Sequence, residues 1–64
     1  GETGRAAELA ADTYQRRRAV LGDDHPDTLR AACLLGALRR ADGDPDGERL
    51  AREAGAGLLR GRLR

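Results

Sequence analysis

Residues 21–29 read Leu-Gly-Asp-Asp-His-Pro-Asp-Thr-Leu, and this stretch decides the fold. Gly22 can adopt the left-handed backbone that ends a helix. Pro26 has a fixed φ angle and no N–H group to lose, so it suits the first turn of the next helix. His25 precedes a proline and is therefore restricted to an extended backbone, which a helix-capping position requires. The stretch predicts the end of one helix, a short turn and the start of a second helix.

Small and apolar residues on both sides of this turn recur at the three-and-four spacing of an amphipathic helix face. The pattern predicts a first helix over residues 3–21 and a second over residues 26–41. The face of the first helix comprises Ala6, Leu9, Ala10, Thr13, Tyr14, Arg17, Val20 and Leu21. That of the second comprises Leu29, Ala32, Cys33, Leu35 and Gly36.

A second turn follows at residues 42–45, which read Asp-Gly-Asp-Pro. Asp44 is suited to cap a helix, and Pro45 is suited to occupy its first position. A third helix is predicted to begin there and to bury the face made by Gly47, Leu50, Ala51, Ala54 and Leu58. Its later glycines, Gly55, Gly57 and Gly61, each disfavour a helix by about 1 kcal/mol relative to Ala, so we expect the last turns to fray.

The composition favours an all-α fold. The 64 residues include one aromatic side chain, Tyr14, and one β-branched aliphatic side chain, Val20. Sheets normally draw on both of these classes for their pleated faces. A chain of this length buries only about 60% of the surface that its unfolded form exposes, so we expect one small domain of marginal stability.

The charge balance and the lone cysteine limit the partners and the cellular compartment that we expect for this chain. Twelve Arg, no Lys and 11 acidic residues give a formal net charge of +1, too small for a field that would steer nucleic acid or a membrane. Cys33 has no second cysteine to pair with, which favours a reducing compartment. With neither a signal peptide nor a run of 18 apolar residues, we expect a soluble, cytoplasmic protein. The lack of an initiating Met suggests a piece of a longer chain.

The sequence contains an internal repeat. The pattern Ala6-x-x-Leu9-Ala10-x-Asp12 recurs 41 residues later as Gly47-x-x-Leu50-Ala51-x-Glu53. The third helix is therefore a copy of the first. Residues 1–22 are predicted to be the second helix of a preceding repeat, and residues 23–64 to be one complete helix-turn-helix repeat.

The order of these residues resembles a tetratricopeptide repeat, and more narrowly the longer, kinesin-light-chain-like variety common in actinobacterial multidomain proteins. The resemblance rests on Leu21-Gly22-x-x-His25-Pro26-x-Thr28-Leu29, then Leu35-Gly36, Gly43 and Gly47-x-x-Leu50. It implies a right-handed solenoid of antiparallel helix pairs, whose first helices line a concave groove for peptide or protein ligands. It implies no catalysis. It also places Gly36 where the family has a small residue for close helix approach, and Gly47 where Ala is usual.

Under this resemblance the second helix supplies the ligand-binding face. The candidate partner-binding residues are Arg30, Cys33, Ala37 and Arg40, at three-and-four spacing beside the packing face. A guanidinium can bind a carboxylate through two parallel hydrogen bonds, so this face favours an acidic peptide or a C-terminal carboxylate. Cys33 and Leu34 depart from the family, which often carries Asn there to grip a peptide backbone. The alternative is an ordinary solvated helix face.

A run of three arginines, residues 16–18, suggests another function, a small helical nucleic-acid-binding domain. The Arg clusters would contact phosphates, and the third helix would act as the recognition helix. The run lies, like Arg39 and Arg40, in the last turns of a helix, where cations interact favourably with the free carbonyls. Acids lie correspondingly at helix starts, as Glu2 and Asp27 do. We favour this explanation of the clusters over nucleic-acid binding.

No residues combine into a catalytic or metal-binding motif. His25 is the only histidine and Cys33 the only cysteine, and the sequence has neither CxxC nor HExxH spacing. We therefore expect no catalytic residues, no metal, no cofactor and no enzyme activity. The predicted function is a non-enzymatic protein–protein interaction (scaffold) module. Its expected partners are a protein or peptide, the neighbouring repeats of a longer chain, or a second copy of itself, with no membrane contact.

Overall fold

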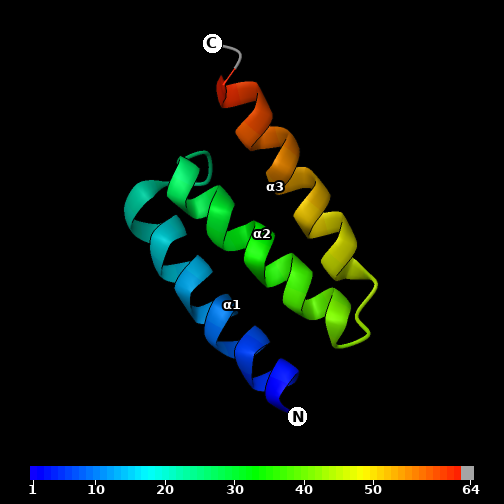
Figure 1. Cartoon of the computed structure of the whole chain (residues 1–64). Coiled ribbons are helices and arrows are strands. Elements are labelled where there is room, and N and C mark those ends of the chain that lie inside the picture. Colours follow the sequence, from blue (N-terminus) through cyan, green and yellow to red (C-terminus); the bar gives the residue numbers. More distant parts are fainter. Residues whose placement is uncertain (63–64) are drawn as a thin grey trace.

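The computed structural model describes residues 1–62, which form three α-helices joined by short turns (Figure 1). α1 spans Glu2–Leu21, α2 spans Pro26–Ala41 and α3 spans Asp46–Arg62. Residues 1–62 include no strand. The all-α prediction is confirmed, and the first two helices end within one residue of their predicted bounds. Residues 63 and 64, at the end of the predicted repeat, lie outside the described part.

The helices form a single layer with α2 in the middle, and successive helices run antiparallel (Figure 1). α2 packs against both α1 and α3, whereas α1 and α3 do not contact one another within the described chain. The principal axes of the molecule measure 40 × 22 × 13 Å. The layer is therefore one helix thick, and α2 is the helix that is flanked on two sides.

The turn between α1 and α2 is built largely as predicted. Gly22 has φ +91° and ψ 165°, and its N–H donates to the carbonyl of Arg18 at 3.0 Å. A positive φ combined with this ψ is adopted almost only by glycine. The backbone of Gly22 is therefore more restrictive than the left-handed helical conformation that was predicted. His25 is the extended N-cap of α2, and its Nδ1 accepts a hydrogen bond from the N–H of Asp27 at 3.1 Å. Pro26 then begins α2.

The turn between α2 and α3 confirms one prediction and corrects another. Asp44 caps α3, because its Oδ1 accepts a hydrogen bond from the N–H of Asp46 at 2.9 Å. Pro45 lies in the turn, one residue before α3, and not at the first helical position. The carbonyl oxygen of Asp44 accepts a hydrogen bond from the N–H of Gly47 at 3.1 Å, three residues later. α3 is helical from Asp46 to Arg62, through the three later glycines that were expected to fray its last turns.

The core lies along one side of α2. The buried residues of this core are Ala10, Thr28, Ala31, Ala32, Leu35 and Ala54, of which Leu35 is 2% exposed. The predicted faces of α2 and α3 are buried or half-buried, as expected. The predicted face of α1 is partly wrong, since Leu9 is 65% exposed and Val20 is 81% exposed. α1 has only α2 as a neighbour within residues 1–62, so it can cover only one side.

α2 and α3 touch backbone to backbone where Gly36 meets Gly47. A Cβ atom on Gly36 would lie 2.6 Å from the N of Ala51 and 2.6 Å from the O of Gly47. A Cβ atom on Gly47 would collide with the carbonyl oxygen of Gly36 and lie 2.5 Å from the N of Arg40. Any side chain at either position would push the two helices apart. Both glycines are therefore needed for this close approach.

Candidate partner-binding face

The candidate site lies on the side of α2 opposite the core. Four residues there follow one another at three-and-four spacing and are all exposed, namely Arg30, Leu34, Ala37 and Ala41. We call these four residues the open row. α1 and α3 flank α2 on its other sides, so neither helix covers this row.

The structure places the four predicted site residues differently. Arg30 and Ala37 belong to the open row, and Arg40 is exposed near the edge of α2 that faces α3. Cys33 is half-buried, and its Sγ lies 3.9 Å from the carbonyl oxygen of Ala51 on α3. The sequence prediction missed Leu34, which is 58% exposed between Arg30 and Ala37. Its helical spacing from both of these residues was the signal that could have identified it.

The two arginines of the site are separately available for carboxylates. The Nη1 of Arg30 lies 2.9 Å from Oδ1 of Asp27, in an exposed ion pair of a kind that contributes only about 0–1 kcal/mol. Arg40 forms no ion pair within residues 1–62. Ten residues separate the two, or about 15 Å along the helix axis. Two acids spaced along an extended segment match this separation, with one acid for each guanidinium.

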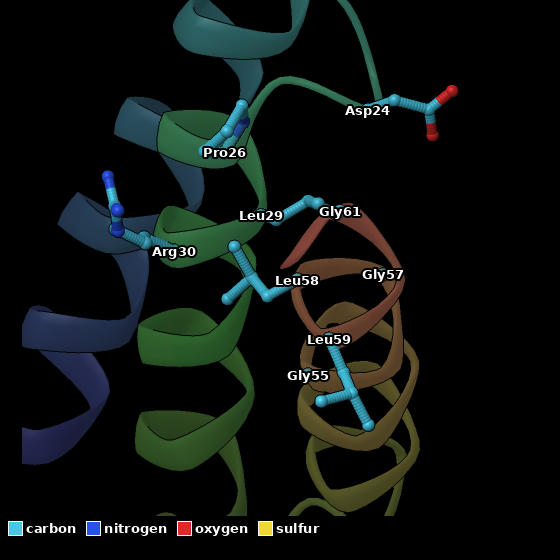
Figure 2. Close-up of a pocket in the computed structure, with 9 residues that line it drawn as sticks. All are labelled: Asp24, Pro26, Leu29, Arg30, Gly55, Gly57, Leu58, Leu59 and Gly61. Carbon is cyan, nitrogen blue, oxygen red and sulfur yellow. The ribbon is translucent and has the colours of Figure 1, made fainter. Parts of the chain in front are cut away.

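One groove lies on each side of α2 near the start of the open row, and Arg30 lines both of them. The α2/α3 groove has a volume of about 500 Å³. Figure 2 shows Leu29 and Leu58 pointing into it from α2 and α3, with Gly57 and Gly61 adding no side chain. The α1/α2 groove has a volume of about 450 Å³ and is lined by Ala6, Leu9, Ala10, Thr13, Arg17, Arg30, Ala31, Leu34 and Leu38.

The arginine run of α1 does not form a continuous basic patch. Arg16 pairs with Asp12 at 3.0 Å, and the Nε of Arg18 pairs with Oδ1 of Asp23 at 2.6 Å. The hydrogen bond from Arg18 to Asp23 raises the pKa of the Arg18 guanidinium. Arg17 turns its Nη1 toward the carbonyl of Asp27, at 3.5 Å. Acids of the chain thus already partner two of the three arginines, which favours the helix-end explanation.

The predicted sorting of charge by helix end is confirmed where the structure describes it. Acidic residues occupy the first turn of all three helices. Basic residues occupy the last turn of α1, with Arg18, and of α2, with Arg39 and Arg40. Each such charge interacts favourably with the partial charge at its end of the helix.

In the part of the chain that the structure describes, no three His, Cys, Asp or Glu side chains come together in a way that could hold a metal ion. Nor does any helix over these residues have the length and apolar character to cross a membrane.

Comparisons with known proteins identify no relative. No protein-family model matches the chain, and no curated protein and no solved structure is significantly similar to it. The likeness to tetratricopeptide repeats accordingly rests on the turn residues, the small residues and the internal repeat of the chain itself.

Proposed function

We propose that this chain is a non-enzymatic protein–protein interaction module that binds a peptide or protein segment along the open row of α2. One observation carries the proposal: α2 is buried on its core side and flanked by two helices, yet it keeps an exposed row, and the groove on each side of α2 reaches this row at Arg30. Grooves beside a helix are a common way to bind peptide segments.

We further propose that the three helices are a fragment of a right-handed tetratricopeptide-type solenoid. In this arrangement residues 1–22 are the second helix of one repeat, and residues 23–64 are the next complete repeat. The antiparallel succession of helices and the backbone contact of Gly36 with Gly47 support the arrangement. Further helix pairs would extend the layer at both of its edges. The lone Cys33 supports a cytoplasmic location.

The ligand proposed for the open row is an acidic segment. Arg30 of the open row and Arg40, which lies beside the row on the α3 side, carry two positive charges, and Leu34 and Ala37 of the row lie between them along the helix. Two carboxylates about 15 Å apart match this pattern, a distance that about five residues of extended chain span.

The test is a titration of the 64-residue chain with a fluorescent peptide that carries two Glu five positions apart, with Leu and Ala between them. A peptide with Lys in place of both Glu is the control. We expect the double variant Arg30→Glu, Arg40→Glu to lose affinity for the Glu peptide by about tenfold or more and to gain affinity for the Lys peptide. Circular dichroism would check that both proteins are helical.

An equal affinity of both proteins for the Glu peptide would overturn the proposal. A labelled single-stranded oligonucleotide tests the alternative function in the same assay. Nucleic-acid binding would be salt-dependent and would depend on residues 16–18 rather than on Arg30 and Arg40.

A further inference from the structure

The internal repeat pairs α1 with α3 residue by residue. Five residues of α3 form the face that packs on α2, namely Gly47, Leu50, Ala51, Ala54 and Leu58. Their counterparts 41 residues earlier are Ala6, Leu9, Ala10, Thr13 and Arg17. These five counterparts are the α1 residues that line the α1/α2 groove. The α1 copy of the helix-packing face therefore faces an open groove.

Burial separates the two copies. Ala54 is 4% exposed and Leu50 is half-buried, whereas their counterparts Thr13 and Leu9 are both exposed. α2 is the one helix that contacts α1 in residues 1–62. The side of α1 turned toward α2 includes Ala6 and Ala10 of the repeated face, and the half-buried Ala7, Ala11 and Tyr14 beside it. The repeated face on α1 is thus only partly covered by α2: Ala10 is 7% exposed and Ala6 is half-buried, whereas Leu9, Thr13 and Arg17 are exposed.

We propose that the α1/α2 groove is a docking site for an amphipathic α-helix with the residue pattern of α2. This inference rests on the proposed function and deepens it, because it names the secondary structure and pattern of a partner segment. The intact second copy of the chain is not this partner, since its own α3 already covers Gly36. The occupant is a helix whose corresponding face is free.

The crossing point sets the first requirement on this helix. Gly36 opposes Gly47 in the α2/α3 contact, and the counterpart of Gly47 on α1 is Ala6. The methyl group of Ala6 holds the docked helix farther out than α2 lies from α3. A small residue at the position equivalent to Gly36 is then still needed for close packing.

Charge sets the second requirement. Arg17 stands on α1 where α3 has Leu58, and in residues 1–62 no carboxylate lies within ion-pair distance of it. Leu29 is the α2 residue at this level of the α2/α3 contact, because a Cβ atom on Gly57 would lie 3.2 Å from its Cδ1. The docked helix is therefore expected to carry an acid at the position equivalent to Leu29, opposite Arg17.

The probe is a synthetic peptide of residues 24–43, which contains α2 and its caps. A helix of this length is marginal alone, so docking should increase its helicity. We expect saturable binding to the 64-residue chain, with a gain in the circular dichroism signal at 222 nm. A peptide with Leu29→Glu should bind up to about fivefold more tightly. A peptide with Gly36→Leu should bind about tenfold more weakly, or worse.

Two variants of the protein locate the binding. Leu9 and Val20 are both exposed apolar residues of α1, but only Leu9 lines the groove. Leu9→Asp should weaken binding of the peptide by about tenfold, and Val20→Asp should leave it unchanged. Both exposed positions tolerate the change without unfolding. Absence of saturable binding to the wild-type chain, or equal effects of the two variants, would overturn the docking site.

The acidic Glu peptide separates the two proposals. If it binds through Arg30 and Arg40 while the α2-like peptide does not bind, helix docking is wrong and the proposed function stands. If the α2-like peptide binds through Leu9 while the Glu peptide shows no dependence on Arg30 and Arg40, the docking site stands and the open-row ligand is wrong.

Discussion

The contact of α2 with α3 and its contact with α1 involve two copies of one helix pattern, with opposite results. At α3 the pattern face meets α2 directly, and Gly36 and Gly47 bring the two backbones together. At α1 the same face lines a groove, and Leu9 is 65% exposed. The comparison teaches that spacing identifies an apolar helix face, whereas the neighbour on that side decides whether the face is buried.

The largest expected effect comes from breaking both contacts at once. Leu35 is 2% exposed on the core side of α2. Leu35→Asp would bury an unpaired charge and destabilise the chain by about 4 kcal/mol or more, which a domain of this size cannot withstand. We expect the helical circular dichroism signal to be lost. Leu35→Met is the control, and it should lower the stability of the chain by less than about 1.5 kcal/mol. A helical Leu35→Asp variant would contradict the described core.

The next test breaks the α2/α3 contact alone. Gly47→Ala should destabilise the chain by about 1–3 kcal/mol, because the new methyl group meets the backbone of α2, although Ala is the better helix former. A methyl group on Gly55, in the same helix, would have nothing within 4 Å, so Gly55→Ala should stabilise the chain by up to about 1 kcal/mol. Urea unfolding of both variants measures the two changes, which must have opposite signs.

The turn that joins α1 to α2 provides a test of the other contact. Gly22→Ala forces a residue with a Cβ atom into φ +91° and ψ 165°, at an expected loss of about 1–3 kcal/mol. Gly22→Asn should be no better, because Asn tolerates the left-handed helical region but not this extended one. Thermal unfolding compares the variants. Recovery of stability with Asn would mean that the turn is an ordinary left-handed helix end.

The smallest expected change sharpens the description of the core between the two contacts. The Oγ1 of Thr28 is buried and, within residues 1–62, has no hydrogen-bond partner. Thr28→Val keeps the shape and removes the unpaired hydroxyl, so it should stabilise the chain by about 1 kcal/mol. Thr28→Ser keeps the hydroxyl and removes a methyl group, so it should destabilise the chain by about 1 kcal/mol. Urea unfolding measures the stability of both variants. A Thr28→Val variant less stable than the wild type would indicate that the Thr28 hydroxyl makes a hydrogen bond.

Local backbone chemistry made most of the fold predictable. Gly22, His25 and Asp44 act through their own backbone or through groups two to four residues away, and the structure confirms the turn or cap predicted at each. The exposure of Leu9 and Val20 was not predictable in this way, because it depends on which helix lies beside α1.

The candidate site was less accessible to sequence reasoning for the same reason. Helical spacing put Arg30 and Ala37 on one side of α2, and the structure leaves both exposed there. Spacing placed Leu34 on the same side as these two residues, but spacing alone did not indicate whether another helix covers it, or that Cys33 turns toward the carbonyl of Ala51. Both outcomes follow from where α1 and α3 cross α2.

The single-layer arrangement also has a consequence for how fast the chain folds. In the described residues each helix contacts only the helix next to it along the chain. Every loop that must close during folding is therefore short, and the entropy lost in closing it is small. Proteins with such local contacts fold in microseconds to milliseconds. Either hairpin, α1 with α2 or α2 with α3, can form first, and α2 then serves as the template on which the remaining helix docks.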